Sequence, residues 1–214
     1  MKLRMKMKKL LSAFLTVGFY ASMTATQSLA QPADPIRMGN PIVNGTGCPD
    51  SSTVSALVSP DQTSLSILFN NYVVDAGAQA QGRARLGRKN CNIRIPLFVP
   101  QGYQVSIFKI DYRGFVDLPY GASAEFSSEY FFGTSPGVKA TKNFSGRQSG
   151  DFMFSNQIGV ESIVWSPCGA STNLAMGTSL KVKVQNSRDE AQATLDSIDV
   201  SSAIQYQLQW KRCF

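Results

Sequence analysis

The sequence predicts an all-β fold: a two-sheet antiparallel β-sandwich, jelly-roll-like, held by two disulfides. Short segments alternate apolar and polar residues, glycine, proline, serine and asparagine separate them, and no stretch shows a convincing helical period. About nine to eleven strands spaced in this way form a sandwich or a barrel. The cysteine–tryptophan–cysteine spacing of immunoglobulin domains is missing, because neither tryptophan lies between Cys48 and Cys91.

Residues 1–30 are predicted to be a secretory signal peptide. A basic start precedes an apolar run over residues 10–23, which is too short for a comfortable membrane span, and Ser28-Leu29-Ala30 fits the small-residue cleavage rule. We expect a secreted or extracellular protein, in the periplasm or at the cell surface if the host is a bacterium. After removal of the signal we expect no integral membrane span.

The charge of the chain depends on this signal. Five of the 21 basic residues lie in it, so residues 31–214 carry 16 basic and 14 acidic residues, a net charge of +2. Net charge therefore gives no reason to expect a nucleic-acid partner. The remaining length suits one domain with a substantial core.

Residues 31–44 are predicted to be a flexible N-terminal lead, and residues 45–214 a single β-sandwich domain. The first strand is expected at 64–75. The segment 76–89 reads as a locally basic loop, either an exposed solvated loop or a patch for acidic polysaccharide or membrane lipid. We favour the solvated loop, because no aromatic residues are interleaved with the charges.

The most readable stretch is 90–114, which we interpret as a central β-hairpin. Ile93, Ile95 and Leu97 alternate with polar residues, and a second apolar run covers residues 105–110. Between them lies Val99-Pro100-Gln101-Gly102, with proline and glycine where a type I turn favours them.

Further strands are predicted at 124–132, 138–144, 151–155, 162–165, 174–185 and 204–213, and a charged loop at 187–193. In the strand at 124–132, Phe126, Tyr130 and Phe132 share one face and are expected in the core. The last strand places Tyr206, Leu208 and Trp210 on one face.

The four cysteines, an even number in an exported chain, predict two disulfides. Spacing alone leaves three connectivities open, of which we favour Cys48–Cys91 and Cys168–Cys213. Zinc would require closely spaced pairs of cysteines, and these are absent from the sequence.

The contexts of these cysteines are the most specific feature of the sequence. They read Gly-Thr-Gly-Cys48-Pro, Arg-Lys-Asn-Cys91, Trp165-Ser-Pro-Cys168-Gly and Trp210-Lys-Arg-Cys213, with Pro-Gln-Gly-Tyr103 and Asp111-Tyr112-Arg113-Gly114 between them. Over residues 45–213 the chain resembles the secreted family catalogued as domain of unknown function 4360. The resemblance implies an exported, disulfide-bonded β domain and brings no catalytic residues.

Several kinds of chemistry are excluded by composition. The chain has no histidine, which removes Ser-His and Cys-His catalysis and histidine-bearing metal sites. We expect no metal, no cofactor and no enzymatic activity. Paired carboxylates remain an alternative, since glycoside hydrolysis needs two acids at the right separation. The candidates are Asp111, Glu125, Glu129 and Glu161; Glu125 and Glu129 share a strand face that reads as an ordinary solvated one, and Asp111 reads as a structural group near Arg113.

The leading hypothesis is a non-enzymatic structural or interaction domain whose partner is a surface polysaccharide or another exported protein. A carbohydrate-binding module and a carboxylate-based polysaccharide hydrolase are the alternatives. The ligand surface suggested for them is Phe131, Tyr120, Glu125 and Glu129, because Phe131 points away from the predicted core. The alternating apolar residues before Phe214 also resemble the last strand of an outer-membrane barrel, although Arg212 and the cysteines disfavour it.

Overall fold

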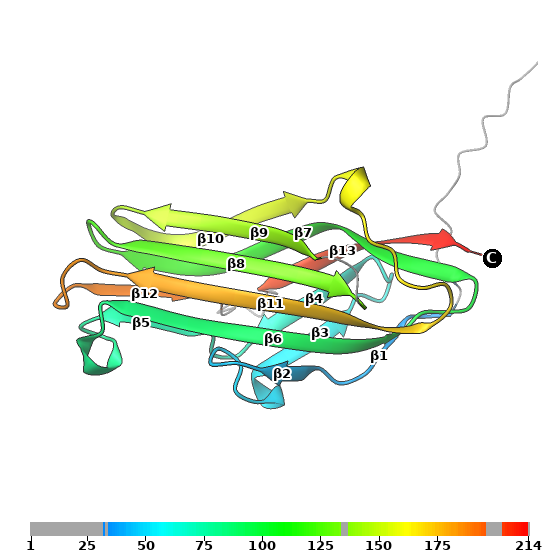
Figure 1. Ribbon diagram of the computed structural model, residues 1–214, viewed down its shortest axis with the longest axis horizontal. Coiled ribbons are helices and arrows are strands. Elements are labelled where there is room, and N and C mark those ends of the chain that lie inside the picture. Colours follow the sequence, from blue (N-terminus) through cyan, green and yellow to red (C-terminus); the bar gives the residue numbers. More distant parts are fainter. Residues whose placement is uncertain (1–31, 33, 134–136, 196–202, 214) are drawn as a thin grey trace, which may run out of the picture.

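The computed structural model describes residues 32, 34–133, 137–195 and 203–213, so the predicted signal peptide lies outside the described residues. The described strands form two antiparallel sheets, as the sequence predicts (Figure 1). The six-stranded sheet has the order β1-β6-β11-β8-β9, with β2 also paired to β6. Its strands are β1 (Arg37–Met38), β2 (Ile42–Asn44), β6 (Leu86–Phe98), β8 (Ser123–Phe132), β9 (Val138–Ser145) and β11 (Ser171–Lys183).

The seven-stranded sheet has the order β3-β4-β13-β7-β12-β5, with β10 also paired to β7. Its strands are β3 (Val54–Val58), β4 (Ser64–Phe69), β5 (Val73–Gly77), β7 (Tyr103–Leu118), β10 (Gln148–Gln157), β12 (Glu190–Thr194) and β13 (Ile204–Arg212). Three short 3-10 turns, η1 (Ser51–Thr53), η2 (Gln81–Arg83) and η3 (Val160–Ser162), are the helical elements of the described chain, and none has the length or apolarity to span a membrane.

The core lies between the two sheets, and aromatic rings from both fill it. Tyr112 of β7 stacks on Phe154 of β10 with ring centroids 4.8 Å apart and lies 5.1 Å from Phe126 of β8. The predicted core residues Phe126, Tyr130 and Phe132 are buried. Tyr206, Leu208 and Trp210, which the sequence places on one face of the last strand, are buried as well. Period-two alternation therefore identified the buried face of β8 and β13 correctly.

The predicted central hairpin is wrong. Its two strands exist as β6 and β7, but β6 pairs with β1, β2 and β11 in one sheet while β7 pairs with β10, β12 and β13 in the other. The turn itself is present, with the amide of Tyr103 donating to the Pro100 carbonyl at 3.2 Å and Gly102 at φ +77°. Both strands bury an apolar face in the same core, so the chain crosses between sheets instead of pairing with itself.

A bulge in β7 explains its uneven apolar pattern. In the pairing with β13, Gln207 lies opposite Lys109 and Leu208 opposite Ile107, so Phe108 is the extra residue. Ile107 and Ile110 are therefore both buried, although they differ in parity, and Phe108 is 40% exposed.

Both favoured disulfides are confirmed. Cys48 bridges to Cys91 and Cys168 to Cys213, with Cα atoms 5.3 and 5.9 Å apart. The first joins the loop after β2 to the middle of β6. The second joins the loop before β11 to the end of β13.

Several element boundaries differ from the predictions. The segment expected to be a flexible lead contains β1 and β2, which pair with β6, and Ile36 in it is buried. This segment therefore forms one edge of the six-stranded sheet. The strand expected at 64–75 is split at residues 70–72 into β4 and β5, which pair with different strands. The last four residues of the expected basic loop at 76–89 are the start of β6, and the expected charged loop at 187–193 contains the start of β12. The strand expected at 162–165 is not among the described strands: residues 160–162 form η3, and Trp165 makes an isolated bridge to Ser106. Ala191 and Ala193 of β12 are buried, and the charged residues around them hid this alternation in the sequence.

Candidate functional site

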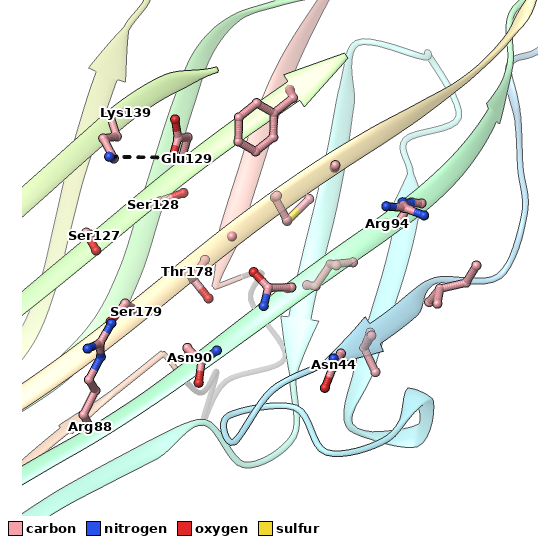
Figure 2. Close-up of a pocket in the computed structure, with 18 residues that line it drawn as sticks. Asn44, Arg88, Asn90, Arg94, Ser127, Ser128, Glu129, Lys139, Thr178 and Ser179 are labelled. Carbon is pink, nitrogen blue, oxygen red and sulfur yellow. Dashed lines mark ion pairs between the residues drawn. The ribbon is translucent and has the colours of Figure 1, made fainter. Parts of the chain in front are cut away.

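The outer face of the six-stranded sheet carries an open groove of about 670 Å³ (Figure 2). Its floor is the central strand β11, where three small residues, Ala175, Gly177 and Ser179, face outward. Longer side chains of β6 form one wall and those of β8 the other. The small side chains of β11 lie between the longer side chains of its two neighbouring strands, so the groove runs along β11.

The strand register sets three rows of side chains across the groove. The first row is Ile42, Arg94, Ala175 and Phe131; the second is Asn44, Asn92, Gly177, Glu129 and Lys139; the third is Asn90, Ser179 and Ser127. The rows change in character from apolar and aromatic to amide and hydroxyl.

A second depression of about 290 Å³ lies on the same face beyond the third row. Lys181, Lys183 and Glu125 line it together with Asn143 of β9. Since Lys181 and Lys183 continue the outward-facing series of β11, the two depressions follow one strand.

Amide groups dominate the middle of the groove. The Asn90 side-chain carbonyl accepts a hydrogen bond of 3.1 Å from the Thr46 hydroxyl, which in turn accepts from the Asn90 backbone amide. Thr46 thereby fixes the Asn90 side chain. Within the described chain, the side chains of Asn44 and Asn92 have no hydrogen-bond partner, so their donors and acceptors face the groove unused.

Phe131 is the aromatic residue that lines the groove, and it lies on the outer face of β8, as its position in the sequence indicated. Its ring is half-buried and packs closely on the backbone of Gly137, where an added Cβ would lie 2.6 Å from ring atom Cε1. Any larger residue at 137 would displace the ring. The close contact between Gly137 and Phe131 therefore orients this ring on the outer face.

The two glutamates on this face are each paired with a lysine. Lys181 Nζ lies 2.7 Å from Glu125 Oε1. Lys139 Nζ lies 3.7 Å from Glu129 Oε2, as the dashed line in Figure 2 shows. The glutamates are four positions apart on β8, which corresponds to about 13 Å along a strand. Glycosidase carboxyl groups lie about 5–9.5 Å apart. The backbone spacing of this pair exceeds that range, and each carboxylate is held by the lysine directly across from it, so the arrangement does not favour hydrolysis.

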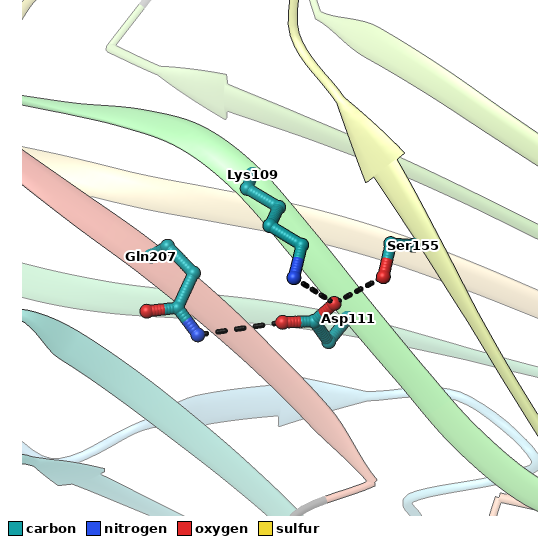
Figure 3. A network of polar contacts seen from close by, with 4 residues as sticks. All are labelled: Lys109, Asp111, Ser155 and Gln207. Carbon is teal, nitrogen blue, oxygen red and sulfur yellow. Dashed lines mark hydrogen bonds and ion pairs between the residues drawn. The ribbon is translucent and has the colours of Figure 1, made fainter.

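The other candidate carboxylates lie elsewhere. Asp111, on the outer face of the seven-stranded sheet, accepts hydrogen bonds from the Ser155 hydroxyl, from Lys109 Nζ at 2.9 Å and from Gln207 Nε2 at 3.3 Å (Figure 3). Burial of Asp111 opposes ionisation, but these hydrogen bonds lower its pKa below the usual value. Its ion-pair partner is Lys109, not the neighbouring Arg113.

Glu161 is exposed in η3, in a segment that lies along β7. The amide of Ile158 donates to the Phe108 carbonyl at 3.0 Å, and that of Ser166 to the Val105 carbonyl at 2.9 Å. Asp111 on β7 and Glu161 in the segment beside β7 thus lie with the seven-stranded sheet, whereas Glu125 and Glu129 lie on the outer face of the six-stranded sheet. Among the described residues, no three histidine, cysteine or acidic side chains are placed to hold a metal ion.

Three of the four suggested ligand-surface residues, Phe131, Glu125 and Glu129, lie on the face that carries the two depressions. Tyr120 lies in the turn between β7 and β8, 88% exposed, and lines neither depression. The residues missed were the outward side chains of β6 and β2. Their signal was the polar series Arg88, Asn90, Asn92 and Arg94, which alternates with the apolar residues used to find the strand.

Comparison with known proteins finds a matching family and a similar secreted protein. The family described as Domain of unknown function (DUF4360) matches residues 34–213. An "Uncharacterized secreted protein" of Arthroderma benhamiae (strain ATCC MYA-4681 / CBS 112371) is 31% identical over 185 residues, which cover 86% of this chain and 74% of that protein. The match begins at residue 34 and so includes β1 and β2.

Proposed function

This chain belongs to the DUF4360 family, and we propose that it is a secreted, non-enzymatic binding domain whose outer groove holds a polysaccharide. Two disulfides are typical of proteins from oxidising compartments, and the relative's name describes a secreted protein. These observations support secretion.

The groove of small residues between polar and aromatic walls carries the proposal. A sugar ring presents hydroxyl groups at its edge and C–H groups on its faces. Asn44 and Asn92 offer both donors and acceptors for hydroxyl groups, and Phe131 offers a half-exposed ring for a C–H face. The groove is open along β11, so an internal segment of a long polysaccharide can enter it from the side and does not need a free chain end.

The state of the acidic side chains supports a binding role over hydrolysis. Glu125 and Glu129 are each paired with a lysine and are too far apart along β8 to act on one glycosidic bond. In a binding groove the same carboxylates serve as hydrogen-bond acceptors for sugar hydroxyls.

The test is polysaccharide binding by the mature, oxidised protein and three groove variants. A glycan array followed by affinity electrophoresis would identify the bound polymer. Gly177→Val fills the floor, where a Cβ meets only Asn92 Oδ1 at 3.2 Å, and valine suits a strand. We expect Gly177→Val, Phe131→Ala and Asn92→Ala each to weaken binding about tenfold, roughly 1.4 kcal/mol.

Tyr120→Ala is the matched control, because Tyr120 is an exposed aromatic residue outside the groove. It should bind as the wild type does, and all four variants should keep the wild-type melting temperature within a few degrees. If no polysaccharide is retained, or if Gly177→Val binds as tightly as the wild type, the proposed function is wrong.

A further inference from the structure

The charged side chains of the two depressions are mostly basic. Five are basic (Arg88, Arg94, Lys139, Lys181 and Lys183), whereas two, Glu125 and Glu129, are acidic. This face is therefore more basic than residues 31–214 as a whole, whose acidic and basic residues nearly balance. The excess charge is local, which a net-charge argument on the sequence could not detect.

The ion pairs leave particular cations available. Lys181 and Lys139 form ion pairs with the two glutamates. Within the described residues, the other three cations of this face, Arg88, Arg94 and Lys183, form no ion pair. Both arginines are exposed and project from the same wall of the groove, as Figure 2 shows. A guanidinium group binds carboxylates in a two-point, planar arrangement.

The spacing of the arginines matches an extended ligand. Arg88 and Arg94 are six positions apart on β6, about 20 Å along the strand, with Asn90 and Asn92 between them on the same face. One ligand lying along the wall would meet a cation, two amides and a second cation in succession. Such a ligand carries anionic groups at intervals and hydroxyl groups between them.

We propose that the groove binds an acidic polysaccharide whose carboxylates pair with Arg88 and Arg94. This inference rests on the proposed function and specifies its ligand class. The amides between the arginines favour a sugar chain with carboxylates over a polyanion that lacks hydroxyl groups. Lys181 and Lys183 of the second depression add further positive charge on the same face, beyond the third row.

The experiment compares two polymers that differ only in charge: polygalacturonate and its fully methyl-esterified form. Affinity electrophoresis and calorimetry would use the full mature chain made in a host that does not glycosylate Asn44 or Asn143, since both residues line the depressions and lie in Asn-x-Ser/Thr sequences. At low ionic strength we expect polygalacturonate to bind at least about tenfold more tightly. This preference should shrink as salt is added.

Arg88→Gln/Arg94→Gln should remove the preference, so that this variant binds polygalacturonate and the methyl-esterified polymer with affinities within about twofold of each other. Arg113→Gln, which removes an exposed arginine from β7 in the other sheet, is the control and should leave the affinities for both polymers unchanged. Equal binding of the two polymers by the wild type would overturn the inference and leave the proposed function standing. Single-stranded DNA bound as tightly as polygalacturonate would also overturn it, and binding to no polysaccharide would refute both.

Discussion

At the scale of single residues, Asp111 shows how a buried carboxylate joins three strands. It lies on β7 and accepts hydrogen bonds from Ser155 of β10 and Gln207 of β13, in addition to its ion pair with Lys109. We expect Asp111→Ala to lower the free energy of unfolding by about 2 kcal/mol at pH 6, because the variant leaves these donors without their charged acceptor. Urea denaturation would measure the change.

The effect of Asp111 should depend on pH. The pKa of Asp111 is lowered in the folded state, so its contribution to stability is present above the unfolded pKa of about 3.9 and is lost as the pH falls through the lower folded value. The difference in the free energy of unfolding between the wild type and Asp111→Ala should therefore be smaller at pH 3 than at pH 6. Asp117→Asn, at an exposed position of the same strand, is the control and should stay within about 0.5 kcal/mol of the wild type. An equal gap at both pH values would contradict this account.

The alternation of residues predicted which side chains point into the core, but not which outward side chains from different strands lie next to one another. Phe131, Glu125 and Glu129 were selected as outward residues of one strand, and they do share a face. Their partners Arg94 and Asn92 come from β6 and meet them across β11. That neighbourhood depends on the order of strands in the sheet, which period-two alternation does not encode.

At the scale of elements, the two disulfides have similar loops but different neighbours. They close 43 and 45 residues, so each is expected to contribute about 4 kcal/mol in the chain-entropy account. Cys91 lies between Asn90 and Asn92 on β6, and the amide of Gly47, next to Cys48, donates to the Asn90 carbonyl at 2.8 Å. The Cys48–Cys91 bridge therefore supports the wall of the groove as well as the fold.

We expect Cys48→Ala/Cys91→Ala and Cys168→Ala/Cys213→Ala to lose similar stability in urea denaturation, whereas only the first should weaken polysaccharide binding. Limited proteolysis provides a readout independent of the ligand: the first variant should be cleaved earlier in residues 45–53, and the second near residues 166–170. Equal loss of binding in both variants, measured where both remain folded, would show that the bridge has no local role.

The link between β6 and β7 shows why sequence predicts elements better than their pairing. The Pro100–Gly102 turn and both apolar runs were found, yet a turn that joins paired strands and one that joins facing sheets use the same residues. The change of parity between Ile107 and Ile110 was a readable sign of the bulge, since two buried residues three apart cannot share a face of a regular strand.

At the scale of the whole molecule, the fold class and the presence of two disulfides were predictable, whereas the strand topology was not. Alternating patterns and frequent turns require two layers that bury their apolar faces together. Strand order depends on contacts between distant segments: β13 pairs with β4 and β7, and β11 with β6 and β8. The groove is a product of this order, because its small floor residues and its walls come from three separate strands.

Four buried tyrosines predict how the whole sandwich responds to alkaline pH. Burial raises the pKa of Tyr72 and Tyr112 to about 12, and also raises the pKa values of Tyr130 and Tyr206. In the unfolded chain a tyrosine loses its proton near pH 10, so above that pH the unfolded state binds fewer protons than the folded one. Their stabilising contribution is thus complete below pH 10 and is lost as the pH rises through the folded values.

We expect the free energy of unfolding to fall between pH 10 and 12 by about 1.4 kcal/mol per pH unit for each of these tyrosines. Phenolate absorbance should then rise together with the loss of tertiary structure, because burial protects the rings until the sheets separate. Tyr206→Phe removes one titrating group, along with a hydrogen bond of 3.2 Å to Met176 Sδ, and should make the decline shallower by one such increment. Stability that stays constant from pH 9 to 11, or full phenolate formation before unfolding, would mean that these hydroxyl groups are not held in the dry interior between the sheets.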